Sequence, residues 1–140
     1  AAGRRGAHAA VAVLRRPRGD ESRLSRRIRR VPGRGIRRRG WRRLARIVQA
    51  QVEQGLPGAA AEGTWDAVVL DPPRQGCSRA VLDLLASMRA ARLVYVSCDP
   101  STLARDLAAL VGAGYRCTSL QPIDLFPQTF HLECVAVLTR

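Results

Sequence analysis

Three residues have side chains that could do chemistry at the ends of short apolar runs. Asp71 follows WDAVVL, Cys98 comes just after LVYV, and Glu133 precedes CVAVL. A cysteine thiolate is a nucleophile, and a carboxylate can act as a general base. Because desolvating a carboxylate costs free energy, an acid beside a buried strand is unusual without a role. The structural alternatives are a buried thiol, a solvent-facing strand-end glutamate and an aspartate that caps a turn.

The elements that must position these residues follow from apolar runs and helical periods. Strands are expected at residues 65–70, 93–96, 115–120 and 132–138. A helix capped by Ser78 and a helix capped by Ser101 or Asp99 separate the first three strands. Their expected apolar faces are Val81, Leu82, Leu85 and Met88, and Leu103, Leu107, Leu110 and Val111, with a stop at Gly112-Ala113-Gly114.

This order of strands and helices predicts an α/β fold with a doubly wound sheet. Ligands bind such sheets at the carboxyl ends of the strands, where Asp71 and Cys98 are expected. Before these elements, a helical period predicts a helix from Trp41 to about Gln54, with Leu44, Ile47, Val48 and Val52 on one face. Gly55 and Pro57 are expected to end it, and residues 59–63 to form a loop.

The charge of the chain lies almost entirely at its front. The formal net charge is +13, yet residues 1–50 alone carry 17 arginines and two acids, and the chain has no lysine or asparagine. Residues 1–43 show no clear apolar period and are not expected to fold unaided. Three interpretations are open: a disordered basic arm on RNA phosphates, a solvated tail, or a wrong-frame translation of a GC-rich gene.

Composition also limits the class of protein. The chain has no apolar run of 18 residues and no recognisable signal peptide, so a soluble cytoplasmic protein without membrane contact is expected. The four cysteines, Cys77, Cys98, Cys117 and Cys134, form no CxxC pair, which predicts free thiols and no metal site in this segment.

Three motifs, in order, resemble the RNA 5-methyluridine methyltransferase family over about residues 65–140. They are DPPRQG at 71–76, VYVSCDPSTLARDL at 94–107 and PIDLFPQTFHLECVAVL at 122–138. The related 5-methylcytidine RNA enzymes typically carry a different proline-cysteine motif after this strand, so DPPR argues against them. The resemblance implies the carboxy-terminal half of a Rossmann-like, class I methyltransferase fold.

The resemblance also implies roles for the three residues. Cys98 matches the nucleophile that adds to carbon 6 of uracil, and helix-start N–H groups would favour its thiolate. Glu133 matches the base that removes the carbon 5 proton, and Asp71 matches a contact to S-adenosylmethionine and the target base. The implied substrate is a uridine in tRNA or rRNA. Arg74 is a candidate for a phosphate contact or a surface ion pair. His131 is expected to be a satisfied polar or surface histidine rather than a second base, and the other cysteines are expected to be structural.

One part of the family pattern is missing from the sequence. The family holds S-adenosylmethionine on an earlier strand followed by a glycine-rich loop and an acidic residue, and residues 1–50 contain no strand followed by Asp and GxG. This favours the wrong-frame or truncated interpretation of 1–43, with residues 44–140 as the carboxy-terminal part of the catalytic domain. It predicts weak cofactor binding by this chain alone and an apolar edge at residues 65–70, which AAVAVL at 9–14 could partly cover. The rival functions are an arginine-rich RNA-binding protein and an inactive remnant.

Overall fold

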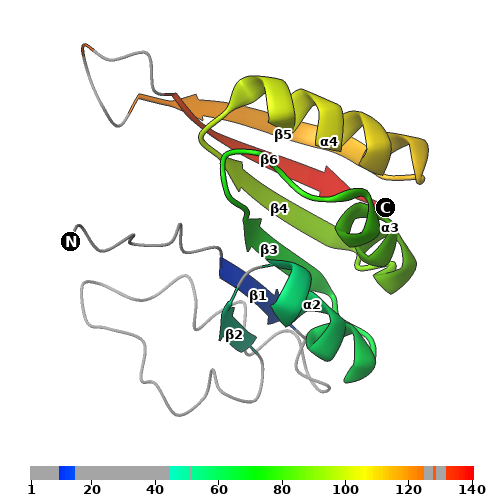
Figure 1. The fold of residues 1–140 in the computed structure, drawn as a ribbon. Helices are drawn as coiled ribbons and strands as arrows, with labels where there is room; N and C mark the ends of the chain where they lie inside the picture. The colour runs from blue at the N-terminus through cyan, green and yellow to red at the C-terminus, as the bar shows by residue number, and fades with distance from the viewer. Residues whose placement is uncertain (1–9, 15–44, 51, 125–127, 129–131) are drawn as a thin grey trace, which may run out of the picture.

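The computed structural model describes residues 10–14, 45–50, 52–124, 128 and 132–140. They form a mixed sheet with the strand order β2-β1-β3-β4-β6-β5 (Figure 1). The strands are β1 (Ala10–Leu14), β2 (Ala45–Gln49), β3 (Ala67–Asp71), β4 (Arg92–Ser97), β5 (Arg116–Ile123) and β6 (Glu133–Thr139). The helices are α2 (Val52–Ala61), α3 (Arg79–Met88) and α4 (Pro100–Gly112).

The centre of the sheet has the connectivity of an α/β protein. β3 pairs parallel with β4, and α3 connects them. β6 lies antiparallel between β4 and β5, while β1 lies antiparallel between β2 and β3. Contacts run from α2 to α3 and from α3 to α4. The expected α/β class, the carboxy-terminal half of a Rossmann-like sheet, is confirmed.

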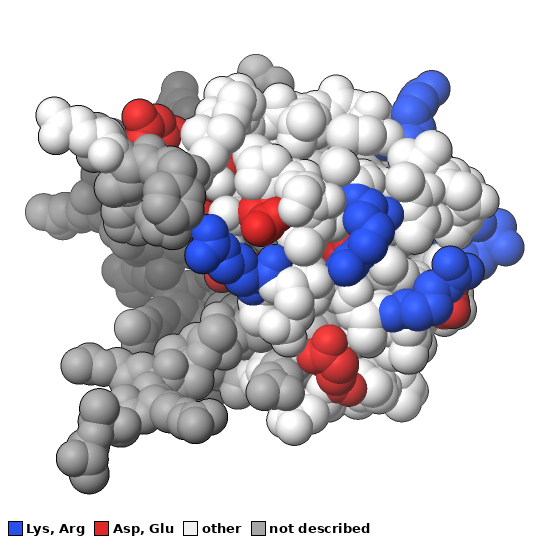
Figure 2. Space-filling model, turned by 45° about the horizontal axis from the view of Figure 1, so that its top comes forward, with Lys and Arg blue, Asp and Glu red and all other residues white. Residues whose placement is uncertain are grey.

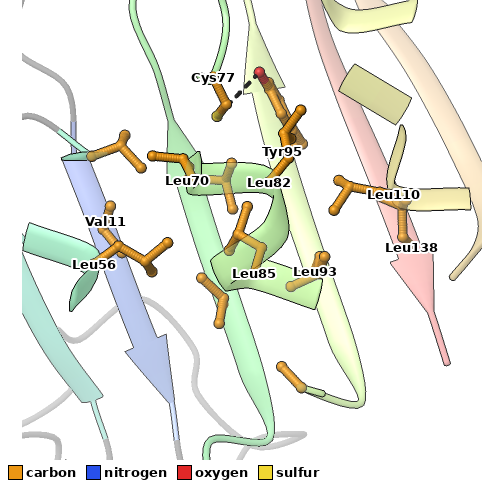
Figure 3. Close-up of a cluster of buried hydrophobic side chains, with 14 of the residues drawn as sticks. Val11, Leu56, Leu70, Cys77, Leu82, Leu85, Leu93, Tyr95, Leu110 and Leu138 are labelled. Carbon is orange, nitrogen blue, oxygen red and sulfur yellow. Dashed lines mark hydrogen bonds between the residues drawn. The ribbon is translucent and has the colours of Figure 1, made fainter. Parts of the chain in front are cut away.

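The core lies between the helices and one face of the central strands. Burial alternates along β4 and β6, as expected when one face of a sheet is covered. The sheet contributes Leu70, Leu93 and Leu138, and the helices contribute Leu56, Leu85 and Leu110 (Figure 3). All six are at most 1% exposed, and burying a leucine completely stabilises a fold by about 1.5–3 kcal/mol.

The helix boundaries predicted from capping residues are confirmed. Ser78 is the N-cap of α3 and accepts a hydrogen bond from the Val81 N–H at 3.4 Å. Asp99, one of the two candidates, caps α4. The helix ends at Gly112, and Gly114 follows with φ +95°, a conformation that favours glycine. The inward assignment of Val111 is wrong, since 47% of it is exposed.

The helix predicted over residues 41–54 is wrong at 45–49, whereas 52–54 are helical as expected, and 41–44 and 51 lie outside the described residues. Residues 45–49 form β2, where Ile47 faces Ala12 of β1 across the ladder and is 77% exposed. The following helix, α2, runs through Gly55 and Pro57 to Ala61, so the predicted loop at 59–63 is also wrong for 59–61. Val52, Leu56 and Ala59 are fully buried along one side of α2. That burial offsets the hydrogen bond that proline cannot donate.

The front of the chain contributes a strand to the sheet. Ala10–Leu14 pairs with β3 over its whole length, from Ala10 opposite Asp71 to Leu14 opposite Ala67. β3 is therefore not an apolar edge, and the cover that AAVAVL could supply is present. Because this strand pairs with β3, it does not test the expectation that residues 1–43 do not fold unaided, which stays a prediction. Residues 1–9 and 15–43 lie outside the described residues.

Candidate active site at one edge of the sheet

The topology brings the three sequence-predicted residues to the same edge of the sheet. Asp71 is the last residue of β3, and Cys98 follows the last residue of β4, which runs parallel to β3. Glu133 is the first residue of β6, which runs antiparallel to β4 and so begins at the edge where β4 ends.

The strand register brings the cysteine and the glutamate to the same end of two paired strands. The β4–β6 ladder ends with Ser97 opposite Cys134, and Cys98 and Glu133 are the next residues beyond this last pair. Both side chains are half-buried. The Cys98 thiol and the Glu133 carboxylate thus lie at the same end of the sheet.

Asp71 belongs to the same edge, two strands away from Glu133. Because Leu70 pairs with Tyr95, Asp71 is level with Val96 of β4. Its side chain is exposed, yet partial desolvation raises the pKa of its carboxyl group. Such a carboxylate fits a hydroxyl or amino donor of a ligand lying on the edge. The contact between Asp71 and S-adenosylmethionine stays a prediction, and the described residues contain no strand followed by a GxG loop.

The turn that carries Cys98 is held by its two neighbours. The Ser97 side chain is 4% exposed, and its Oγ donates to the Asp99 carbonyl at 3.0 Å and accepts from the Asp99 N–H at 3.2 Å. Asp99 Oδ1 accepts from the Ser101 hydroxyl at 2.6 Å and from the N–H groups of Ser101 and Thr102 at 2.9 and 3.1 Å. These bonds, the hydroxyl first, lower the pKa of Asp99. Two helix-start N–H groups expected to favour the Cys98 thiolate therefore donate to Asp99.

Hydrogen bonds connect the DPPRQG loop to the first turns of α4. The Thr102 hydroxyl donates to the Arg74 carbonyl at 3.0 Å, and Arg105 Nη2 donates to the carbonyls of Gln75 and Cys77 at 3.0 and 3.2 Å. The Cys77 N–H donates to Asp106 Oδ2 at 2.7 Å. Consequently the loop that starts at Asp71 and the helix that follows Cys98 form one hydrogen-bonded unit.

Asp106, to which the sequence pattern assigned no role, is the centre of this unit. Its side chain is fully buried and also accepts from the Tyr95 hydroxyl at 2.5 Å and from Arg105 Nη2 at 2.7 Å. Burial and the bond to Asp106 raise the pKa of Tyr95, and the ion pair raises the pKa of Arg105. The available signal was an acid spaced three and four residues from Leu103 and Leu110, on the buried side of α4.

The other residues with predicted roles are either buried, exposed or outside the described residues. Cys77 and Cys134 are buried as structural thiols would be, and burial raises the pKa of Cys77 to about 11. Cys117 is exposed, which contradicts a buried structural role. Arg74 is exposed, and its charge contributes to the lowered pKa of Asp99. His131 lies outside the described residues, and the described part of the chain holds no group of three His, Cys, Asp or Glu suited to a metal ion.

Comparison with known proteins connects this edge to a family. The sequence profile of tRNA (uracil-5-)-methyltransferases matches residues 60–140. The chain belongs to this family. It is 50% identical over 96 residues to an uncharacterized RNA methyltransferase of Thermosynechococcus vestitus and 51% identical over 91 residues to one of Bacillus cereus. These matches cover 68% and 64% of this chain, and 21% and 20% of the two relatives.

A solved structure agrees with the family assignment. The chain superposes on the Pyrococcus abyssi tRNA (uracil-54, C5)-methyltransferase, crystallised with S-adenosyl-L-homocysteine, with a TM-score of 0.51 and 39% sequence identity. The match covers 55% of this chain and 19% of that protein. The chain thus spans about a fifth of the length of the relatives it matches. No helix among the described residues is long and apolar enough to cross a membrane.

Proposed function

We propose that residues 44–140 are the carboxy-terminal part of a catalytic domain that methylates carbon 5 of a uridine in tRNA or rRNA. The position of Cys98 and Glu133, directly beyond the last pair of the β4–β6 ladder, is the observation that carries this proposal. The reaction needs a nucleophile that reaches carbon 6 of the pyrimidine ring and a base that reaches the proton on carbon 5. The P. abyssi relative, a tRNA (uracil-54, C5)-methyltransferase crystallised with S-adenosyl-L-homocysteine, supports the same reaction class.

The proposed chemistry has two stages. The Cys98 thiolate adds to carbon 6 of uracil, and the electron pair of the 5,6 double bond moves into an enolate that makes carbon 5 nucleophilic. S-adenosylmethionine, when bound, would supply the methyl group to carbon 5, with its S–CH₃ bond broken and S-adenosylhomocysteine as the leaving group. Glu133 then removes the proton from carbon 5. The double bond re-forms, and the Cys98 thiolate leaves.

The edge position of these residues suits a base that has left its stack. A base inside a helix does not expose carbon 6 to a protein thiol, so the target uridine must flip into the site. In this proposal Asp71 contacts the flipped base or S-adenosylmethionine, and Arg74 contacts a neighbouring phosphate. Both residues belong to the DPPRQG loop, which is fastened to the helix after Cys98.

A chimera tests the proposed function, because the chain matches only about a fifth of its relatives' length. Residues 60–140 would replace the matching segment of the B. cereus relative, which is 51% identical to this chain over 91 residues. With labelled S-adenosylmethionine and unmodified tRNA and rRNA transcripts, we expect labelled 5-methyluridine on nucleoside analysis. Cys98→Ser should abolish the product, whereas Cys117→Ser, at an exposed cysteine, should leave it unchanged.

The unaltered relative serves as the positive control for folding and substrate. If the Cys98→Ser chimera is as active as the unaltered relative, Cys98 is not the nucleophile. A folded chimera that yields no 5-methyluridine on an RNA that the relative methylates would refute the proposed function. An arginine-rich RNA-binding protein remains the second candidate, favoured by the charge of residues 1–50. If this candidate is correct, the 140-residue chain should bind RNA and residues 60–140 should support no methyl transfer in the chimera.

A further inference from the structure

We propose that Asp106 is a positioning residue that fixes the DPPRQG loop against the Cys98 turn. This inference rests on the proposed function and extends it to three residues without an assigned role, Tyr95, Arg105 and Asp106. All three lie in the motif VYVSCDPSTLARDL, yet none is at the sheet edge where the chemistry is placed.

Both oxygens of the Asp106 carboxylate have their hydrogen bonds supplied from within the chain. Oδ2 accepts from the Cys77 N–H at 2.7 Å and from the Tyr95 hydroxyl at 2.5 Å, while Oδ1 accepts from Arg105 Nε and Nη2 at 2.9 and 2.7 Å. The carboxylate is fully buried and neither oxygen lacks a partner. Three separate segments, the end of the loop, β4 and α4, thus meet at one side chain.

The energetics of the Asp106–Arg105 pair favour a role in geometry over a role in stability. Only the Asp106 side of this pair is buried, because the Arg105 side chain is 57% exposed. The desolvation of Asp106 and the solvent around Arg105 both reduce the net stability that the pair contributes. The carboxylate does fix geometry, because its hydrogen bonds require donors at defined positions. These donors keep the DPPRQG loop, which starts at Asp71, against α4, the helix that follows Cys98.

Gly76, the glycine of DPPRQG, lies directly against this ion pair. Its φ is +75°, and a Cβ there would lie 2.5 Å from Asp106 Oδ2 and 2.7 Å from Arg105 Nη2. The loop backbone therefore touches both charged groups. Because the close approach leaves no room for a methyl group, glycine is required where the loop contacts Asp106.

The alkylation rates of cysteines in the 140-residue chain show whether loss of the Asp106 hydrogen bonds exposes only the DPPRQG loop. In Asp106→Asn the amide NH₂ must face either Arg105 or the Cys77 N–H, both donors, so one of these interactions becomes repulsive. We expect alkylation of Cys77 to become at least tenfold faster, while Cys134 in β6 stays protected. Asp83→Asn, in the exposed Arg79–Asp83 pair at 3.0 Å, is the matched control and should change neither rate.

The rate of adduct formation separates positioning from simple stability. In the chimera, RNA carrying 5-fluorouridine would trap Cys98, and single-turnover traces give an amplitude and a rate constant. A residue needed only for stability lowers the amplitude, because fewer molecules are folded. We expect Asp106→Asn to keep most of the amplitude and to lower the rate constant at least tenfold. Tyr95→Phe, which removes one donor, should lower it less.

An unchanged rate constant in both variants, or equal acceleration of alkylation at Cys77 and Cys134, would overturn the positioning role of Asp106. If Asp106→Asn does not fold, Tyr95→Phe decides alone: a slower rate constant at full amplitude supports positioning, and an unchanged one overturns it. Failure of the unmutated chimera to form any adduct would instead overturn the proposed function, and this inference with it.

Discussion

At the scale of single residues, Glu133 is assigned the second stage of the reaction alone. Glu133→Gln in the chimera keeps the size of the side chain but loses the base. We therefore expect methylation to proceed and the methylated Cys98–RNA adduct to accumulate, with turnover reduced at least 100-fold. A denaturing gel with labelled RNA measures the adduct. Normal turnover of the variant would exclude Glu133 as the base.

Cys77 gives a pH dependence with a defined sign. Burial raises its pKa from the ordinary value of 9.0 to about 11, so the folded chain favours the neutral thiol. The stability from this group is complete below about pH 9 and is lost as pH rises from about 9 to 11. We expect the urea midpoint of the 140-residue chain to fall over that window, and to fall less in Cys77→Ala. Equal loss in both proteins would contradict this.

Residue chemistry was predictable where a reactive type stood at a strand end. Cys98 and Glu133 follow from such positions together with the family motifs, and the structure places both directly beyond the last pair of the β4–β6 ladder. The network at Asp106 was not predicted, because its partners come from three segments that meet only after folding. Cys117 lies outside the three motifs, and the sequence did not indicate that every residue of its strand, β5, would be exposed.

At the scale of elements, two glycines make a matched pair. Gly76→Ala forces a side chain into a left-handed conformation and against Asp106, and we expect it to destabilise the chain by about 1–3 kcal/mol. Gly58→Ala, in α2 with nothing within 4 Å of the new Cβ, should stabilise by about 0.5–1 kcal/mol. Urea unfolding of the two variants tests this. A Gly76→Ala variant as stable as the parent would show that the loop is not held as described.

Elements were predictable where local signals agreed with the tertiary structure. α3 and α4 combined a capping residue, an apolar face and a stop, and all but Val111 are placed as expected. β2 was mistaken for a helix because its pairing partner, β1, lies at residues 10–14, far earlier in the chain. α2 was cut short at Pro57 because local rules cannot weigh the burial of Leu56 and Ala59.

At the scale of the whole molecule, charge and fold are separated along the chain. Residues 51–140 carry seven arginines and nine acids, and Figure 2 shows basic and acidic side chains interspersed over the described part of one face. The excess positive charge lies in residues 1–50. Nonspecific RNA binding should therefore come from the front, while any selectivity should come from the sheet edge with Cys98.

This division predicts the salt dependence of RNA binding. Deleting residues 1–43 would also remove β1 and expose β3, so replacing the arginines of 15–43 with glutamine is the better variant. Its affinity should be lower, and its plot of log affinity against log salt should be flatter by about 0.7 for each phosphate that arginine no longer neutralises. Filter binding between roughly 50 and 300 mM salt measures the slope. An unchanged slope would place the phosphate-binding residues elsewhere.

The central claim is that Cys98 forms a covalent bond to the target uracil. The most direct measurement is mass spectrometry of the chimera after reaction with RNA carrying 5-fluorouridine, followed by nuclease and protease digestion. Fluorine cannot leave carbon 5 as a proton does, so the adduct should persist. We predict a methylated fluorouridine on the peptide that contains Cys98 and none on Cys77, Cys117 or Cys134. Absence of an adduct, or its presence on another cysteine, would contradict the claim.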